Sequence, residues 1–518
     1  MTDDDARTHD EPPRVSGQQS SLRVVVVLLL LAFVPTLHRY ANGFVWDDIT
    51  TIARGETLHH LRSIPSLFTH RTMFVSQGAA DEAITPVDTY RPVTLTTFVI
   101  DSQFSGRRPW AYHTTNLLLH AAATLLLWRT LRHLVGKGAE ALAPWGAAFF
   151  ALSPQLAEGH VWINGRSDPL CTVFGLAALL CALRSWTAPS PRPRWLVAAG
   201  ALFLLGLGSK EVLVGVLPAL FFWPDQRTLR ERATRMTPFF IATACYFAVR
   251  ITVLGGVRAS YGAAQTRYSL ARLAVLWFDA MRELLMPMHV HLRMMLETYG
   301  RISALWLALA WLGAAGLLVL AFALRARLPQ LRFALLWFAG PLAPVAVIAS
   351  IDWMGFGRYL YLPAVGVAAL LVSLAAAARV YVPQRSVVLV RLLVGAYFVL
   401  LAVKLAAWTA DFRSEDTLYG AAMQDAPETS VGYGYLGLLY FERDDCARGL
   451  PLLLRAREIT PVAQRYWGPL GRCALRLGDL REAARTAQAG SRRFPTDPQV
   501  RVLVQEFRQR VQRPSGAR

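Results

Sequence analysis

The sequence predicts an all-α protein: a polytopic bundle of about eleven membrane helices, followed by a short solenoid of helical repeats. Of its 518 residues, 54% are hydrophobic and only 17% are charged, whereas soluble domains carry about 25% charged residues. Several apolar runs reach or approach the ~20 residues that cross a bilayer as a helix. From about Asp411 the chain becomes polar, and a 34-residue repeat fills this tail.

The first part of the chain contains an anchor and a long polar segment. Residues 1–20 are polar and acidic, which predicts a disordered cytoplasmic tail. The apolar run from about Leu22 to Leu37 lacks a cleavage site and predicts a retained first span. The stretch 40–112 is much longer than an ordinary connection and is expected to be an outer loop. A helix from about His113 to Leu134 then returns to the cytoplasm.

The remaining membrane helices are predicted from apolar runs that alternate with basic loops. We expect them near 141–152, 168–184, on both sides of 208–211, and at 238–254, 302–324, 333–350, 360–377 and 387–408. The segment 268–288 has its charges near one helical face, which favours an amphipathic helix lying flat in the interface over another span.

The net charge of +19 does not indicate a nucleic-acid partner. The arginines lie mostly in short loops between apolar runs, where the positive-inside rule places cytoplasmic charge. This pattern predicts a cytoplasmic amino terminus and an extracytoplasmic tail. The bundle is therefore expected to occupy 21–409 within a lipid bilayer, with the repeats at 410–511 and a disordered end at 512–518.

The tail repeats with a fixed period. Leu436-Gly437 returns as Leu470-Gly471, and Pro461 returns as Pro495. A 34-residue period with leucine, small residues and a closing proline is typical of the tetratricopeptide repeat. Cys446 and Cys473 lie on helices that are expected to pack together. They form either a disulfide, which an extracytoplasmic location permits, or two free buried thiols.

Asp47 and Asp48 are the candidate catalytic residues. They end the motif Phe44-Val45-Trp46-Asp47-Asp48, close to where the first span leaves the bilayer. Acids at a membrane boundary are costly unless they bind or catalyse something. A carboxylate held by a rigid helix suits a base that deprotonates an acceptor hydroxyl. Adjacent residues face different ways, so we expect one base and prefer Asp47, the alternative being a helix cap beside a solvated acid.

A second set of polar residues falls on the same predicted face and suits the binding of a phosphate-linked donor. Arginine binds phosphate through two hydrogen bonds, and lysine binds it as a point charge. The candidate residues are Tyr90, Arg91, Glu158, Arg166, Asp168, Lys210, Glu211 and Arg358. The structural alternatives are a surface Arg91 that pairs with a loop acid, an Arg166–Asp168 ion pair and a Lys210–Glu211 ion pair. Glu158, His160 and Asp168 match no known ligand spacing, so no metal is expected.

His113, Asn116 and His120 recur every three or four residues on one face of their predicted helix. This spacing favours a polar seam that faces the interior of the bundle over a set of ligands.

Taken in order, these motifs resemble the transmembrane and tetratricopeptide-containing O-mannosyltransferases, the TMTC family, and their bacterial relatives. The resemblance is carried by Phe44–Asp48, Tyr90-Arg91-Pro92-Val93-Thr94, His113-x2-Asn116-x3-His120, Glu158 with Gly165-Arg166-Ser167-Asp168, Ser209-Lys210-Glu211, Arg358-Tyr359-Leu360-Tyr361-Leu362-Pro363, and the repeats. It implies a GT-C glycosyltransferase fold, a polyprenyl-phosphate-linked sugar as donor, and catalysis by the acid matching Asp47 or Asp48.

The chain also departs from that family. Its repeat array is short, and Ser153-Pro154 stands where the family usually has His-Pro. The composition, rich in alanine, leucine and arginine, is typical of bacteria. It favours an inner-membrane protein with periplasmic repeats and an undecaprenyl-phosphate sugar as donor.

The expected function is an inverting transfer of mannose or another hexose from a polyprenyl-phosphate carrier to a hydroxyl of a protein or glycan at the outer membrane face. The repeats would present the acceptor, and no cofactor is expected because the lipid-linked sugar is a substrate. The alternative is a non-catalytic scaffold that recruits a periplasmic partner through its repeats. A transporter is disfavoured because no paired broken helices or inverted halves are visible.

Overall fold

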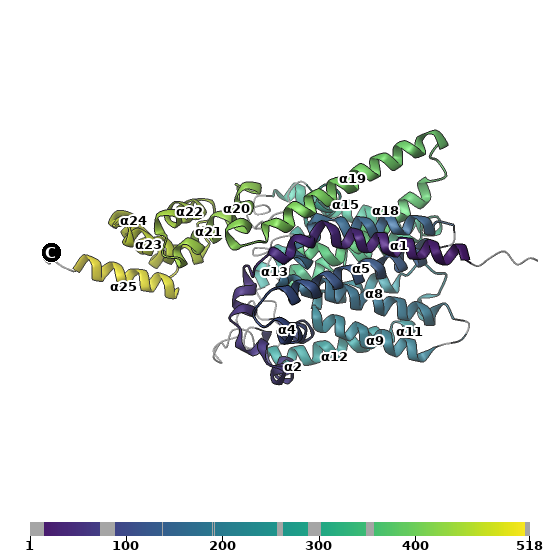
Figure 1. The fold of residues 1–518 in the computed structure, drawn as a ribbon, viewed down its shortest axis with the longest axis horizontal. Helices are drawn as coiled ribbons and strands as arrows, with labels where there is room; N and C mark the ends of the chain where they lie inside the picture. Colours follow the sequence, from purple (N-terminus) through teal and green to yellow (C-terminus); the bar gives the residue numbers. More distant parts are fainter. Residues whose placement is uncertain are drawn as a thin grey trace, which may run out of the picture.

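The protein is all-α, as predicted. The computed structural model describes residues 15–72, 89–136, 138–188, 190, 192–255, 263–287, 302–348 and 357–512, and each regular element in these ranges is a helix. Figure 1 shows a bundle of roughly parallel helices and, at one end, an elongated stack of shorter helices. We call this the stack end of the bundle. The start of α1 and the short helix α11 lie at its other end (Figure 1).

Six described helical segments are long and apolar enough to cross a membrane. They are Ser21–Ala41, Ile163–Trp186, Thr237–Leu254, Ala304–Ala326, Gly357–Ala378 and Gln384–Asp411. Three shorter apolar segments accompany them, namely Glu140–Leu152, Pro193–Ser209 and Glu211–Phe221. The protein is therefore a membrane protein, while the total of about eleven spans stays a prediction.

The bundle contains both long helices and short helical turns. In chain order they are α1 (Val15–Phe33), η1 (Val34–Ala41), η2 (Ile49–Ala53), η3 (Glu56–His59), η4 (Leu61–Ser63), α2 (Ile64–Thr69), α4 (Pro92–Ser105), α5 (Trp110–Val135), η5 (Glu140–Leu142), α6 (Ala143–Leu152), η6 (Pro154–Leu156), α7 (Ala157–His160), η7 (Ile163–Arg166), α8 (Ser167–Trp186), α9 (Pro193–Ser209), η8 (Glu211–Val216), α10 (Leu217–Phe221), α11 (Leu229–Arg235), α12 (Thr237–Leu254), α13 (Ala263–Leu285), α15 (Ala304–Ala323), η9 (Leu324–Ala326), α16 (Gln330–Ala339), α17 (Leu342–Ile348), η11 (Gly357–Leu360), α18 (Tyr361–Ala378) and α19 (Gln384–Asp411).

Two segments differ from their expected form. The outer loop at 40–112 contains α4, whose Leu95, Phe98 and Val99 are buried against the bundle at helical spacing. The helix expected at 333–350 is broken between α16 and α17, next to Gly340. A Cβ on Gly340 would lie 2.0 Å from the carbonyl oxygen of Gly215 in η8, so two backbones cross there in direct contact. Small residues permit such close approaches between membrane helices.

The ends of the expected domains can be compared with the helices. α1 begins at Val15, inside the range expected to be a disordered tail, and residues 1–14 and 513–518 lie outside the described residues. The expected boundary at 409/410 lies within the last turn of α19. α13 does not qualify as a span by composition, which agrees with its amphipathic pattern, and its flat placement stays a prediction.

The stack consists of consecutive packed helices. They are α20 (Glu415–Asp425), α21 (Val431–Glu442), α22 (Cys446–Ile459), η12 (Gln464–Tyr466), α23 (Trp467–Arg476), α24 (Leu480–Arg493) and α25 (Pro498–Gln512). Each helix packs on its neighbour in sequence, so α21 pairs with α22 and α23 pairs with α24. This arrangement fits the 34-residue period, although the tetratricopeptide class stays a prediction.

A disulfide settles the state of the two cysteines in the stack. Cys446 at the start of α22 is bonded to Cys473 in α23, and their Cα atoms are 5.0 Å apart. The alternative of two free buried thiols is therefore wrong.

The crossing of Gly340 and Gly215 predicts a difference between two glycine substitutions. Gly340 already has helical backbone angles, so Gly340→Ala adds only a methyl group, which overpacks the contact and destabilises the fold by about 1–3 kcal/mol. Gly395 in α19 has no atom within 4 Å of an added Cβ. Gly395→Ala is therefore expected to be neutral or to stabilise by about 0.5–1 kcal/mol. Thermal midpoints in one detergent compare the two, and equal midpoints would contradict the tight crossing.

Candidate active site

The segment that carries the two acids is tied to distant helices by hydrogen bonds. The side chain of Asn42 donates to the carbonyl of Thr409 in α19 at 2.9 Å, and the N–H of Gly43 donates to the carbonyl of Arg413 at 3.1 Å. His113 of α5 contacts the carbonyl of Asn42 at 3.2 Å. The start of the motif is thus fixed between α5 and the end of α19.

Asp48 is fully buried and both of its carboxylate oxygens accept hydrogen bonds from the backbone. The N–H of Asn164 donates to Oδ1 at 2.8 Å, and the N–H of Val45 donates to Oδ2 at 3.3 Å. Burial raises the pKa of Asp48 well above its ordinary value, and these two N–H groups oppose that shift. Its geometry suits a residue that positions the motif against η7.

Asp47 has a different environment. Its side chain is partly exposed, and no other described residue makes a hydrogen bond to its carboxylate. Burial raises the pKa of Asp47, while the charges of Arg358 and Arg465 lower it. A carboxylate that is held in place but not hydrogen-bonded can accept a proton from a bound hydroxyl.

Trp46 holds the backbone before Asp47 in an uncommon conformation. Its φ of 56° lies in the left-handed region, which is strained for a bulky residue. Its ring stacks on Trp162 with centroids 4.9 Å apart, and the indole N–H of Trp162 donates to the carbonyl of Val45 at 3.3 Å. Strain of this kind persists where the surrounding contacts enforce it, and it often occurs at functional sites.

Arg358, whose charge acts on the carboxylate of Asp47, is surrounded by aromatic rings. Its guanidinium carbon is 5.7, 5.3 and 5.2 Å from the ring centroids of Trp46, Trp162 and Tyr359. Its backbone N–H donates to the carboxylate of Glu158 at 3.1 Å. Within the described part of the chain, no hydrogen bond or ion pair engages the guanidinium itself. Its donors are therefore available to an anion.

The other three candidate cations are already paired with acids. Lys210 donates to both carboxylate oxygens of Asp168, at 2.6 and 2.5 Å, and both side chains are buried. Arg91 forms two hydrogen bonds with Glu211, at 3.2 and 3.0 Å. The Lys210–Glu211 alternative is therefore wrong.

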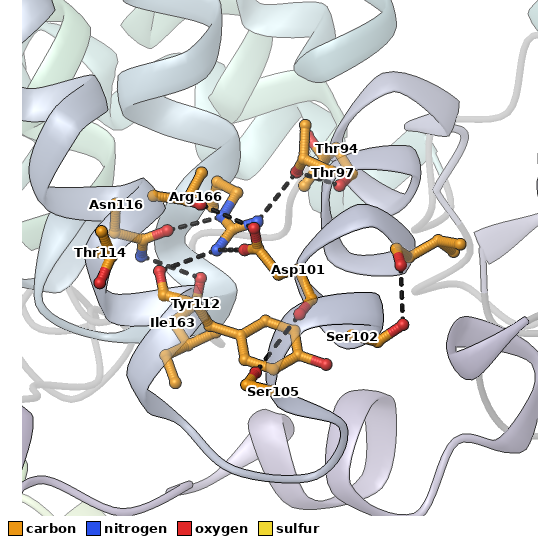
Figure 2. A network of polar contacts seen from close by, with 12 residues as sticks. Thr94, Thr97, Asp101, Ser102, Ser105, Tyr112, Thr114, Asn116, Ile163 and Arg166 are labelled. Carbon is orange, nitrogen blue, oxygen red and sulfur yellow. Dashed lines mark hydrogen bonds and ion pairs between the residues drawn. The ribbon is translucent and has the colours of Figure 1, made fainter. Parts of the chain in front are cut away.

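Arg166 is the most enclosed of these cations. Figure 2 shows its guanidinium surrounded by Asp101, Asn116, Thr97 and Tyr112. It pairs with Asp101 at 2.5 Å, and it donates to Asn116 at 2.6 Å, to the Thr97 hydroxyl at 3.1 Å and to the Tyr112 carbonyl at 2.9 Å. Its partner is thus Asp101, which makes the Arg166–Asp168 alternative wrong.

Asp101 was not among the residues singled out from the sequence, although its position in the sequence could have indicated it. It is the one charged residue of α4, and an acid within a membrane bundle is rarely placed there without a partner. Arg39 was not singled out either. Arg39 is fully buried, and it donates to the carbonyl of His160 at 2.7 Å and contacts its ring nitrogen at 3.1 Å.

The remaining candidates lie in the interior. His113, Asn116 and His120 are all buried. His120 contacts the Tyr361 hydroxyl at 2.7 Å and its ring stacks on His160 at 3.8 Å. The Tyr90 hydroxyl donates to the carbonyl of Phe68 at 2.9 Å. Across the described residues, no three His, Cys, Asp or Glu side chains form a group that could hold a metal ion.

Comparison with known proteins shows what part of this chain is similar to. Residues 99–255, from α4 to α12, match the family described as dolichyl-phosphate-mannose-protein mannosyltransferase. The TMTC-like resemblance is confirmed. The matched range contains Asp101, Arg166, Asp168 and Lys210. No solved structure matches the chain significantly.

Curated relatives agree with this TMTC-like resemblance. Protein O-mannosyl-transferase F38B6.6 of Caenorhabditis elegans is 25% identical over 182 residues, which cover 34% of this chain and 25% of that protein. Protein O-mannosyl-transferase TMTC3 of Mus musculus is 28% identical over 197 residues, 38% of this chain and 20% of its own length. Protein O-mannosyl-transferase Tmtc2 of Drosophila melanogaster is 27% identical over 283 residues, which cover 52% of this chain and 29% of that protein. The chain thus spans less than a third of these relatives, and together the matches support a membrane glycosyltransferase.

The different surroundings of the two adjacent acids predict different effects on stability. Asp48→Asn places an amide NH₂ against a backbone N–H donor, which costs about 1–3 kcal/mol. Asp47→Asn breaks no hydrogen bond with the described residues and is expected to leave the free energy of unfolding nearly unchanged. Thermal unfolding of both variants in the same detergent tests this, and a larger loss for Asp47→Asn would reverse the assignment.

The ion pair in Figure 2 predicts a larger effect. Asp101→Asn leaves the buried guanidinium of Arg166 without its acid, which costs about 3–5 kcal/mol. Glu506→Gln is the matched control, because Glu506 pairs with Arg472 where both side chains are partly exposed, and such pairs contribute about 0–1 kcal/mol. Equal unfolding midpoints for the two variants would contradict a structural role of Asp101.

Proposed function

We propose that this protein transfers mannose or another hexose from a polyprenyl-phosphate carrier to a hydroxyl of a protein or glycan at the outer face of the inner membrane. One observation carries the proposal. The Asp47 carboxylate, without a hydrogen bond to the other described residues, lies within the electrostatic influence of Arg358, whose guanidinium also has unused donors. Sugar transfer from a phosphate needs this combination of a base and a cation.

In the proposed reaction Asp47 acts as the base and Arg358 binds the leaving phosphate. Asp47 accepts the proton of the acceptor hydroxyl as its oxygen attacks the anomeric carbon. The bond between that carbon and the phosphate oxygen breaks, and the electron pair leaves with the phosphate. Arg358 donates hydrogen bonds to the phosphate as its charge grows. Attack from the face opposite the leaving group inverts the anomeric configuration.

We assign a supporting role to the residues that are paired with each other. Two ion pairs, Lys210–Asp168 and Arg91–Glu211, hold their cations in place. Lys210 also lies 4.6 Å from the ring centroid of Tyr359, the residue after Arg358. Glu158 fixes the backbone of Arg358. Arg166 has most of its donors in use, so we assign it to positioning η7 rather than to phosphate. Of the four cations expected at the donor, Arg358 and the partly exposed Arg91 are the ones we propose to reach it.

The names of the similar proteins suggest the first substrates to test. The matched family is described by a dolichyl-phosphate-mannose donor, and the relatives are named protein O-mannosyl-transferases. We therefore propose a polyprenyl-phosphate mannose as donor and a protein hydroxyl as acceptor, with the stack outside the cytoplasm. The Cys446–Cys473 disulfide supports that location, because disulfides persist in oxidising compartments.

The proposal predicts the kinetics of two variants. The purified protein is incubated with a panel of polyprenyl-phosphate hexoses and threonine-containing peptides, and both sugar transfer and donor hydrolysis are measured. Loss of the base in Asp47→Asn is expected to lower transfer by about 10²–10⁴-fold. Arg358→Gln is expected to lower it by a similar factor because the leaving phosphate loses its cation.

The control is Arg485→Gln, which removes an exposed arginine of the stack and should leave transfer unchanged. Full activity of Asp47→Asn would rule out Asp47 as the base. If the wild-type protein neither transfers nor hydrolyses any donor of the panel, the result would favour the non-catalytic scaffold.

A further inference from the structure

The stack reaches the acid motif with polar and aromatic side chains. Tyr435 of α21 meets the ring of Trp46 edge to face, with centroids 6.1 Å apart. Tyr419 of α20 stacks on Tyr435 at 5.3 Å. Trp46 directly precedes Asp47, so the stack forms part of the immediate surroundings of the proposed base.

Arg465 brings a second cation to the same place. It lies in η12, between α22 and α23, and its guanidinium donates to the hydroxyl of Tyr435 and lies 5.3 Å from its ring centroid. Its charge acts on the carboxylate of Asp47 together with that of Arg358. Asp47 is therefore influenced by one arginine from the bundle and one from the stack.

The polar contacts are not needed to attach the stack. An apolar cluster already joins the stack to α19 and to the motif. Its buried members include Val45, Trp162, Leu405, Trp408, Phe412, Leu418, Leu436 and Leu439. Burial of apolar area on this scale supplies the free energy of docking. The hydroxyl of Tyr435 and the guanidinium of Arg465 therefore need another explanation.

The two substrates reach such a site by different routes. A polyprenyl carrier is held in the bilayer, so its phosphate meets residues of the bundle such as Arg358 and Arg91. A protein or glycan acceptor arrives from water, where the stack lies. From this division, which rests on the proposed function, we propose that Tyr435 and Arg465 form the acceptor side of the active site and position the hydroxyl at Asp47.

This assignment makes the stack a part of the catalytic unit rather than a separate recruiting module. Arg465 and Tyr435 are then positioning residues for the acceptor. A merely electrostatic role of Arg465, as a counter-charge for Asp47, would act on kcat. A positioning role acts on the KM of the acceptor, so the two roles are separable by kinetics.

The test measures the acceptor KM, the donor KM and kcat for point variants of the full chain. The probes are polyprenyl-phosphate mannose and the threonine peptide that the wild-type protein modifies fastest. Arg465→Gln is expected to raise the acceptor KM about tenfold, because a charge-assisted hydrogen bond is lost, with the donor KM within about twofold of wild type. Tyr435→Phe, which removes only the hydroxyl, should raise the acceptor KM less, and Arg465→Lys should recover part of the loss.

Arg472→Gln is the matched control, because Arg472 lies on the neighbouring helix α23 and pairs with Glu506 of α25. It should have wild-type kinetics. An unchanged acceptor KM in Arg465→Gln overturns the proposal, whether kcat falls, the thermal midpoint falls or neither changes. A wild-type protein without transfer or hydrolysis would instead overturn the proposed function, and this inference with it.

Discussion

The carboxylate of Asp48 fixes the position of the motif Phe44–Asp48 in the fold. By accepting hydrogen bonds from Val45 and Asn164, it ties the acid motif to η7. η7 is held in turn by Arg166, which joins α4 and α5 through Asp101 and Asn116. Asp47 projects from this rigid connection. An asparagine at position 48 would have one acceptor oxygen in place of two and would place its NH₂ group against a backbone donor.

Three cations of the membrane part form ion pairs with acids from distant segments of the sequence. Arg166, Lys210 and Arg91 each meet an acid from another segment, and each of these pairs is largely buried. Burying an ion without its partner is expensive, so each pair restrains the relative positions of two helical segments. Arg358 departs from this pattern among these four described cations, because aromatic rings surround it in place of an acid. This cation without an acid partner is also the one whose charge acts on the Asp47 carboxylate.

Local patterns in the sequence predicted the helices, the acidic motif and the candidate cations, because hydrophobic period and charge are local properties. They could not predict the partners. The two ion pairs considered as structural alternatives joined residues one or two positions apart, but neighbours at that spacing point in different directions. Asp101 and Arg91 find their partners from distant segments, which only the tertiary fold brings together.

The choice between Asp47 and Asp48, and the break between α16 and α17, likewise depend on contacts made far along the chain. The backbone N–H of Asn164 donates to Asp48 and distinguishes it from Asp47. The backbone of Gly215 contacts that of Gly340 at the break between the two helices. The sequence did not indicate that Tyr435 and Arg465 lie near Asp47, because tyrosine and arginine are common on the faces of helical repeats.

The disulfide has a consequence for η12. Cys446 and Cys473 are 27 positions apart, and the covalent ring that they close contains Arg465. Closing such a ring removes conformational freedom from the enclosed chain. The orientation of this short turn is thus restrained by a covalent bond as well as by packing. Oxidation of two thiols in the stack therefore narrows the range of positions available to the guanidinium of Arg465.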